Sequence, residues 1–160
     1  MWGDCEDCQA IAEVALPLGG SLNLAVPTAA QLTLLSSFNN ANRITPRVLD
    51  KFTHLGSGKL RYDGADARHF IINATISVKI LGSQGPLDVF MGIFVNGVPS
   101  YVGAVGFRSQ AGLTSTGGFY TLITYREGRT LVTGDTVEGG LEASLALTFP
   151  LSDYYSLSIR

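Results

Sequence analysis

Cys5 and Cys8 are the residues whose spacing most resembles a site of chemistry. They form a Cys-x-x-Cys sequence, with Glu6 and Asp7 between them. A structural zinc site needs four ligands, and both histidines of the chain lie far away in the sequence. A redox pair needs a low thiol pKa, whereas the neighbouring acidic residues raise it. We therefore interpret both cysteines as ordinary thiols, and the alternative is a zinc site shared between neighbouring copies.

Two loops resemble ligand-binding motifs without matching them. The sequence from His54 to Leu60 resembles a phosphate-binding loop, but its first glycine would fall at Thr53, and Leu60 stands where Ser or Thr is required. Asp63 and Asp66 supply two carboxylates, which are too few for the roughly six to eight oxygen ligands of calcium. We predict a polar turn in both places.

No nucleophilic constellation is visible around His54 or His69. Neither histidine has a serine–glycine elbow beside it. We expect His54 in a loop and His69 at the solvent-exposed start of a strand. A carbohydrate-active enzyme with two carboxylates about 5–10 Å apart stays open as a hypothesis, because sequence does not reveal spatial proximity. The main expectation is that the chain is not an enzyme and needs no metal or cofactor.

The composition limits the classes of protein to which the chain can belong. The 160 residues suit one domain, and only 15% are charged against roughly 25% in an average soluble domain. The net charge of −2, without a basic stripe, excludes a nucleic-acid partner. No apolar run approaches the roughly 20 residues that span a membrane, so we expect no membrane partner. The acidic N-terminus does not indicate a secretory signal.

Alternation of apolar and polar residues predicts half-buried strands from residue 43 onwards. In 69–80, the apolar face consists of Phe70, Ile72, Ala74, Ile76, Val78 and Ile80. Asn96-Gly97 favours a type I′ hairpin turn, because both residues accept a positive φ. Further strands are predicted at 88–95, 98–107, 119–126, 130–132, 136–138, 141–149 and 154–160, with a turn at Glu127-Gly128. Short strands with frequent turns predict an all-β, antiparallel jelly-roll sandwich.

The first 42 residues differ from the rest because their apolar pattern is irregular and interrupted by proline and glycine. We interpret 1–42 as an extended N-terminal arm and 43–160 as the jelly-roll domain. Within the arm, 10–16 is predicted as a short helix, and 22–26 and 32–35 as short strands. The alternative is that this segment supplies one or two edge strands to its own domain.

Some predicted strands are apolar on both faces. In 89–95, Phe90 and Phe94 lie on the other side of the strand from its apolar face. In 119–125, Tyr120 and Leu122 do the same. An exposed patch of this kind exceeds what soluble monomers usually tolerate. A symmetric oligomer would cover it in every copy. The alternative is that the N-terminal arm of the same chain covers it.

Four stretches carry a family resemblance. They are a tyrosine–glycine turn at Leu60–Gly64, an alternating strand led by an aromatic residue at Ala67–Ser77, an Asn-Gly hairpin at Phe90–Pro99 and a Gly-Asp step at Gly134–Glu138. Over roughly residues 44–160 the chain resembles the tumour-necrosis-factor/C1q-type jelly rolls of virion proteins from tailed bacteriophages. Leu151–Tyr155 also fits the place of the Gly-Asp step, so two registers stay open near the C-terminus.

The resemblance implies a homotrimer around a threefold axis and a structural role in a virion. We expect capsid decoration: a cement protein that resists internal pressure through apolar burial, with the major capsid protein as its second partner. It would lie on the capsid surface after assembly in the host cytoplasm. The alternative is a receptor- or carbohydrate-binding fibre tip, which would expose aromatic residues on loops. The candidates for those aromatics are Tyr101, Phe107 and Tyr154.

The expected contact residues follow from the apolar pattern. For the trimer interface we expect Phe90, Phe94, Tyr120 and Leu122. For the capsid contact we expect three residues of the arm: Trp2, Leu16 and Leu18.

Overall fold

The computed structural model describes residues 10–23, 32–38, 40–80, 87–109, 119–144 and 151–160, and every structural statement below concerns these ranges. The elements are β1 (Ile11–Ala15), β2 (Leu22–Asn23), β3 (Thr33–Leu34), η1 (Leu35–Ser37), η2 (Ala41–Arg43), β4 (Thr45–Asp50), β5 (Phe52–Gly56), β6 (Lys59–Tyr62), β7 (Arg68–Ile80), β8 (Leu87–Val95), β9 (Val98–Ser109), β10 (Phe119–Leu131), β11 (Thr136–Ala143), β12 (Leu151–Ser152) and β13 (Tyr155–Ile159). None of the helices in this described part is long and apolar enough to cross a membrane.

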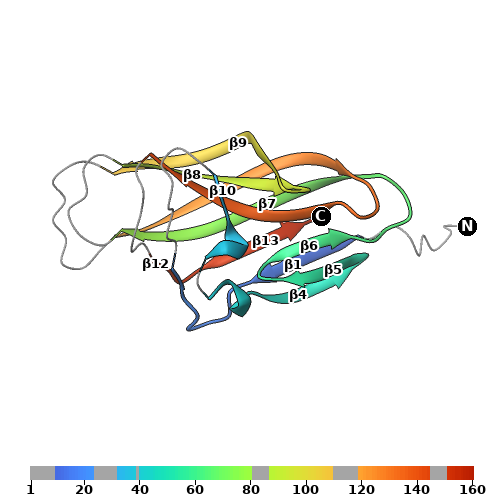
Figure 1. The fold of residues 1–160 in the computed structure, drawn as a ribbon, viewed down its shortest axis with the longest axis horizontal. Helices are drawn as coiled ribbons and strands as arrows, with labels where there is room; N and C mark the ends of the chain where they lie inside the picture. The colour runs from blue at the N-terminus through green and yellow to red at the C-terminus, as the bar shows by residue number, and fades with distance from the viewer. Residues whose placement is uncertain (1–9, 24–31, 39, 81–86, 110–118, 145–150) are drawn as a thin grey trace, which may run out of the picture.

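Two antiparallel sheets pack against each other as a sandwich (Figure 1). The first sheet has the order β4-β1-β13-β7-β10, and β12 and β2 continue it beyond the end of β13. The second sheet has the order β5-β6-β11-β8-β9, with β3 paired to β11 beyond β6. The predicted all-β, antiparallel jelly-roll sandwich is therefore confirmed.

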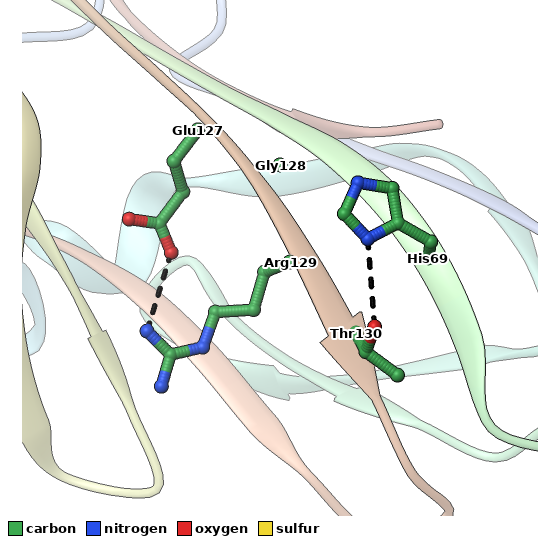
Figure 2. Close-up of a pocket in the computed structure, with 5 residues that line it drawn as sticks. All are labelled: His69, Glu127, Gly128, Arg129 and Thr130. Carbon is green, nitrogen blue, oxygen red and sulfur yellow. Dashed lines mark hydrogen bonds and ion pairs between the residues drawn. The ribbon is translucent and has the colours of Figure 1, made fainter.

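β7 and β10 form the longest ladder of the first sheet, from Phe119↔Ile80 to Leu131↔Arg68. The alternation in β7 is as predicted, since Phe70, Ile72, Ala74, Ile76 and Val78 are all at most 3% exposed. β10 follows the same rule up to Tyr125. Glu127 and Arg129 then take inward positions that the pattern would give to apolar residues (Figure 2).

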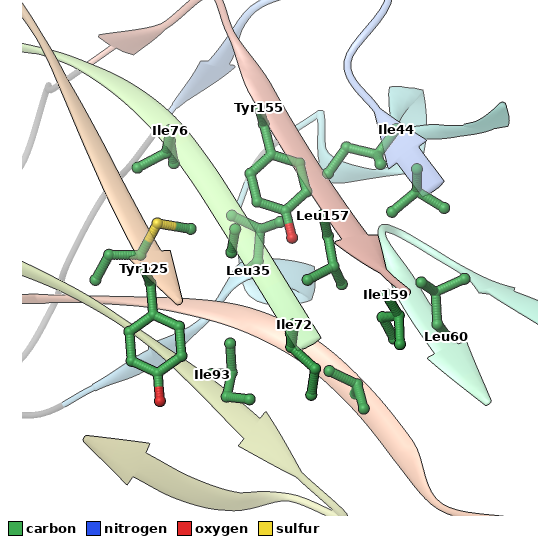
Figure 3. Close-up of a cluster of buried hydrophobic side chains, with 14 of the residues drawn as sticks. Leu35, Ile44, Leu60, Ile72, Ile76, Ile93, Tyr125, Tyr155, Leu157 and Ile159 are labelled. Carbon is green, nitrogen blue, oxygen red and sulfur yellow. The ribbon is translucent and has the colours of Figure 1, made fainter. Parts of the chain in front are cut away.

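The core lies between the two sheets (Figure 3). It includes three residues of the last strand, Tyr155, Leu157 and Ile159, each 0% exposed. The rings of Phe52, Tyr62 and Phe70 meet with centroids 5.1–5.5 Å apart. Each large side chain that becomes fully buried contributes about 1.5–3 kcal/mol, so this core is the main source of stability.

The segment 10–16 is a strand, and the predicted short helix is wrong. β1 lies between β13 and β4, with Ala12 and Val14 buried. A helix this short is marginal in water, whereas pairing along both edges satisfies the backbone groups of the strand. The N-terminal segment thus supplies strands to its own domain, as in the alternative, but β1 is an inner strand and not the edge strand expected there. The division between 42 and 43 stays a prediction.

Two further local predictions are wrong. β10 continues through Glu127 and Gly128, where we predicted a turn, because its ladder with β7 is unbroken from residue 119 to 131. His54 lies in β5 instead of a loop. Its Nε2 accepts a hydrogen bond from the Gly58 backbone N–H at 3.2 Å, across the turn that joins β5 to β6. The Asn96-Gly97 hairpin is confirmed, and both residues have positive φ, 53° and 76°.

Candidate functional site

The outer face of the first sheet carries short, mostly uncharged side chains. The strand register aligns them in rows: Thr124–Thr75–Ser156, then Arg126–Asn73–Ser158–Glu13. The Oγ1 atoms of Thr75 and Thr124 are 3.1 Å apart and share a hydrogen bond. Charged residues gather at the Glu13 end, where Arg47 and Arg160 approach its carboxylate at 3.4 and 3.9 Å.

The opposite end of this face carries two exposed side chains with large apolar surfaces. Leu122 is 66% exposed on β10, and Tyr154 is 43% exposed just before β13. Ser77 lies opposite Leu122 in the ladder, and its backbone N–H donates to the Tyr154 carbonyl at 2.9 Å. This end of the face therefore offers a leucine and a tyrosine that a contact with another protein would cover.

Ser77 holds the turn that presents Tyr154. Its Oγ donates to Asp153 Oδ1 at 2.8 Å and accepts from the backbone N–H groups of Asp153 and Tyr154 at 3.1 and 3.0 Å. Ser77 is 3% exposed, although the alternation of β7 gives it an outward position. The turn between β12 and β13 therefore covers this hydroxyl and fixes the tyrosine.

The outer face of the second sheet is partly covered by the N-terminal segment of the same chain. Gly92 and Gly140 lie opposite each other in the ladder of β8 and β11. A Cβ on either glycine would lie 2.9–3.2 Å from atoms of Leu32, so the two glycines leave room for that leucine. Phe94 lies beside the same two glycines, since a Cβ on Gly140 would lie 2.7 Å from its ring. Leu32 and Phe94 are 6% and 7% exposed.

The four predicted interface residues do not gather in one patch. Leu122 lies on the outer face of the first sheet, and Phe90, 38% exposed, lies on the outer face of the second. Phe94 is buried by its own chain, and the side chain of Tyr120 lies outside the described residues. Leu122 and Phe90 therefore remain as candidates on two different surfaces.

The predicted capsid contacts are also divided. Trp2 lies outside the described residues, and Leu16 is 4% exposed within the core of the sandwich. Leu18 is fully exposed between β1 and β2. Of the aromatics considered for a fibre tip, Tyr154 is exposed, while the side chains of Tyr101 and Phe107 lie outside the described residues.

A polar pocket borders β10, and our sequence analysis did not predict it. It is a depression of about 380 Å³ that is open to solvent, and it is lined by His69, Glu127, Gly128, Arg129 and Thr130. The only sequence signal was the pair of charged residues, Glu127 and Arg129, two positions apart, and we interpreted Glu127 as part of a turn. In the described part of the chain, no cluster of three or more His, Cys, Asp or Glu residues could hold a metal ion. Cys5 and Cys8 lie outside that part.

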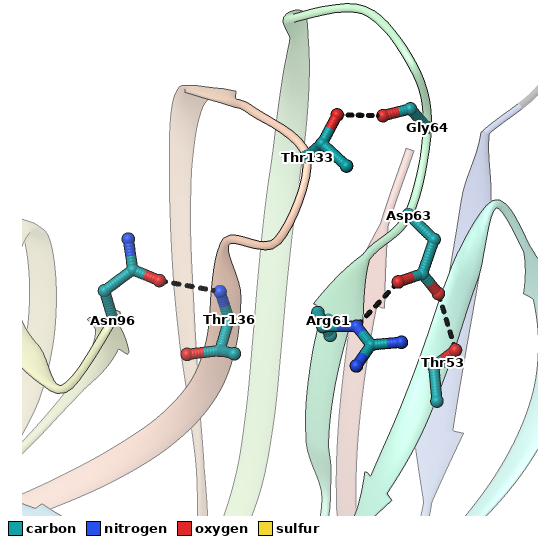
Figure 4. Close-up of polar contacts among 7 residues, drawn as sticks. All are labelled: Thr53, Arg61, Asp63, Gly64, Asn96, Thr133 and Thr136. Carbon is teal, nitrogen blue, oxygen red and sulfur yellow. Dashed lines mark hydrogen bonds and ion pairs between the residues drawn. The ribbon is translucent and has the colours of Figure 1, made fainter.

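The motifs behind the family resemblance meet at one end of the sandwich (Figure 4). Asn96 Nδ2 donates to Asp135 Oδ1 at 2.7 Å, and Asn96 Oδ1 accepts from the Thr136 backbone N–H at 2.9 Å. The Asn-Gly hairpin and the Gly-Asp step thus bind each other and connect β8 to β11.

Asp63 forms a second polar contact at this end. It accepts hydrogen bonds from Thr53 Oγ1 at 2.5 Å and Arg61 Nε at 2.6 Å, and these bonds lower the pKa of its carboxyl. The carboxylate is therefore engaged by side chains of β5 and β6, at the start of the polar turn.

Comparison with known proteins supports the fold alone. No protein-family model and no curated protein sequence matches this chain. The crystal structure of murine APRIL matches with a TM-score of 0.51 at 10% identity, over 94% of this chain and 98% of that chain. Eiger TNF from S. frugiperda matches with a TM-score of 0.54 at 8% identity, over 94% and 91%. The globular domain of zebrafish complement 1qA has a TM-score of 0.46 at 14% identity, over 95% and 96%.

Two observations agree on the fold. One is the match over nearly the full length of both TNF-type structures. The other is the strand order of the two sheets, β4-β1-β13-β7-β10 and β5-β6-β11-β8-β9. The chain has a tumour-necrosis-factor/C1q-like jelly-roll fold.

Proposed function

We propose that this chain is a non-catalytic structural module that assembles as a homotrimer. The observation that carries the proposal is the outer face of the first sheet, which presents Leu122 and Tyr154 beside a strip of short, uncharged side chains. Covering an exposed leucine in a contact gains about 1.5–3 kcal/mol, and the uncharged strip adds little desolvation cost. The motif resemblance to trimeric virion proteins supports the number three.

A ring of three copies needs two different patches on each copy, because a contact around a threefold axis is heterologous. Leu122 and Phe90 provide exposed apolar side chains on two different outer faces. The outer faces of a sandwich point in opposite directions, and joining them would stack copies in an open row, so we assign only the Leu122 face to the proposed ring.

The proposed setting of the trimer is the surface of a bacteriophage head, where it acts as a decoration protein bound to the major capsid protein. The support is the resemblance of roughly residues 44–160 to virion jelly rolls. Leu18 adds an apolar side chain that is fully exposed between two strands of the first sheet. A capsid groove that covers Leu18 would gain its burial energy without unfolding any part of the sandwich.

Electron microscopy of phage heads that lack this protein, with and without the added pure protein, tests the setting. The expected result is new density with threefold symmetry on the outer shell. Leu18→Asp should lower its occupancy, whereas Leu55→Asp, at a 45% exposed leucine on β5, should not. Heads that remain bare at saturating protein would contradict the decoration role.

A further inference from the structure

Glu127 is a buried carboxylate at a position where the alternation of β10 requires an apolar residue. It is 6% exposed and accepts hydrogen bonds from Ser100 Oγ at 2.8 Å and from Tyr125 OH. Burying a charge is costly unless it is paired, and an apolar residue would serve stability at least as well. Such departures from the local pattern concentrate at functional sites. The two hydroxyls bind one carboxylate oxygen, Oε2, and hold the group in a fixed orientation.

The second carboxylate oxygen faces Arg129. Arg129 NH1 lies 3.4 Å from Glu127 Oε1, and the arginine side chain is 39% exposed. A guanidinium has five N–H donors, and among the described contacts of Arg129 this one engages only NH1. The pair therefore places a carboxylate that is only 3% exposed beside several donors that are partly exposed, and its net charge is zero.

Gly128 lies between Glu127 and Arg129 in the sequence and faces the other side of the strand. A Cβ on Gly128 would lie 2.7 Å from His69 Nε2, so the glycine allows the imidazole to lie close to the β10 backbone. His69 Nδ1 is 3.4 Å from Thr130 Oγ1. Figure 2 shows Glu127 and Arg129 on one side of β10 and His69 and Thr130 on the other. The pocket of about 380 Å³ follows the edge of β10 that lacks a paired strand.

We propose that this pocket binds a neutral saccharide through a pair of neighbouring hydroxyl groups. Each sugar hydroxyl both donates and accepts, so one can donate to Glu127 Oε1 while the next accepts from Arg129. The lining residues are all polar or glycine, which disfavours an apolar ligand. The carboxylate disfavours an anion, and Arg129 disfavours a cation. The volume suits one sugar unit, and the site does not depend on self-association.

The test is a titration of the full chain with uncharged methyl hexosides and N-acetylhexosamines, followed by saturation-transfer NMR and calorimetry. Acetate and lactate serve as charged comparisons. We expect millimolar binding of at least one neutral sugar. Arg129→Gln and Glu127→Gln should each weaken it by about tenfold or more. Arg43→Gln, at an exposed arginine of η2, makes the same change far from the pocket and should leave the affinity unchanged.

Arg129→Gln is the decisive variant, because its partly exposed side chain can change without removing core packing. The result that overturns the proposal is absence of binding by every neutral sugar, binding of the carboxylates alone, or equal affinity in the wild type and Arg129→Gln. The mass of the protein in the same samples separates this test from the proposed function. A monomer that binds sugar supports the pocket and rejects the trimer, and a trimer without binding does the reverse.

Discussion

Two buried tyrosines differ in what their hydroxyl groups contact. Tyr125 OH donates to Glu127, within the cluster beside the pocket. Tyr155 OH lies close to Gly139 in the centre of the core, and no well-formed hydrogen bond to a described residue satisfies it. A buried polar group without a partner costs free energy, so the first phenol stabilises the fold and the second does not.

The first prediction compares the two phenols by removing one oxygen at a time. Tyr125→Phe should lower the free energy of unfolding by about 1–3 kcal/mol, because Glu127 loses a donor. Tyr155→Phe should leave it unchanged or raise it by up to about 1 kcal/mol, because the ring stays and only the unpaired oxygen leaves. Urea denaturation measures both. Equal losses in the two variants would contradict this account of the core.

The second prediction concerns alkaline pH. Burial, together with the nearby charge of Glu138, raises the pKa of Tyr155 above its ordinary value of 10.0, and contact with the Gly139 backbone only partly opposes this. Above pH 10 the unfolded chain loses the phenol proton while the folded chain keeps it, so stability should fall as the pH rises. The urea midpoint should drop between about pH 9 and about pH 11, and less steeply in Tyr155→Phe. Parallel curves would exclude Tyr155 as a cause.

The third prediction concerns mildly acidic pH. Burial lowers the pKa of His54 below 6.5, and its Nε2 must be unprotonated to accept the Gly58 N–H. The unfolded chain therefore binds the proton first, and stability should decrease as the pH falls below 6.5. His54→Gln retains an acceptor but does not titrate, so its thermal midpoint should change less with pH. A slope unchanged by this substitution would refute the role of His54.

The direction of a side chain, inward or outward, was predictable where the pattern of a single strand determines it. The inward face of 70–78 follows from period-2 alternation, because a slip of one residue would expose every apolar side chain of β7. The role of Glu127 was not predictable, since its partner Ser100 lies 27 positions away on β9. Only the fold brings β9 and β10 to the same edge of the sandwich.

At the scale of elements, the contact between Asn96 and Asp135 joins the β8–β9 hairpin to the turn before β11. Asn96 also occupies the left-handed region, with φ 53°. Asp135 Oδ2 accepts from the Val132 backbone N–H at 2.8 Å, which shapes its own turn. These loops are thus fixed by side chains from two turns that lie 39 residues apart.

The fourth prediction measures this connection. Asn96→Ala should lower the free energy of unfolding by about 1–3 kcal/mol, because Asp135 and Thr136 lose their partners. Asn40→Ala is the matched control, since Asn40 has φ 67° without a side-chain capping bond. Both variants share the cost of alanine in the left-handed region, so their difference isolates the hydrogen bonds. No difference would indicate that the two turns are independent.

Elements with a strong local signal were predictable, and those that depend on neighbours were not. The Asn-Gly pair defines the β8–β9 hairpin by itself, because few other residues accept two positive φ values in succession. β1 has alanine and glutamate, which favour helix, and becomes a strand because β13 and β4 offer it partners on both edges. The space that Leu32 occupies depends on two glycines, Gly92 and Gly140, which are 48 residues apart in sequence and opposite each other in the ladder.

At the scale of the whole molecule, the sandwich buries one face of each sheet and leaves two outer faces that differ. The N-terminal segment covers part of the second sheet around Phe94, as the single-chain alternative expected. The outer face of the first sheet keeps Leu122 and Tyr154 in solvent. The sequence indicated that some strands are apolar on both faces, but it could not indicate which of these faces the chain covers by itself.

The measurement that tests the central claim most directly is the mass of the pure protein in solution by light scattering. The account predicts three times the chain mass of 17.0 kDa at micromolar concentration. Leu122→Asp should convert the trimer to a folded monomer, while Val98→Asp, at a 64% exposed valine of the β8–β9 hairpin, should leave it a trimer. A wild-type protein that remains monomeric at this concentration would contradict the account.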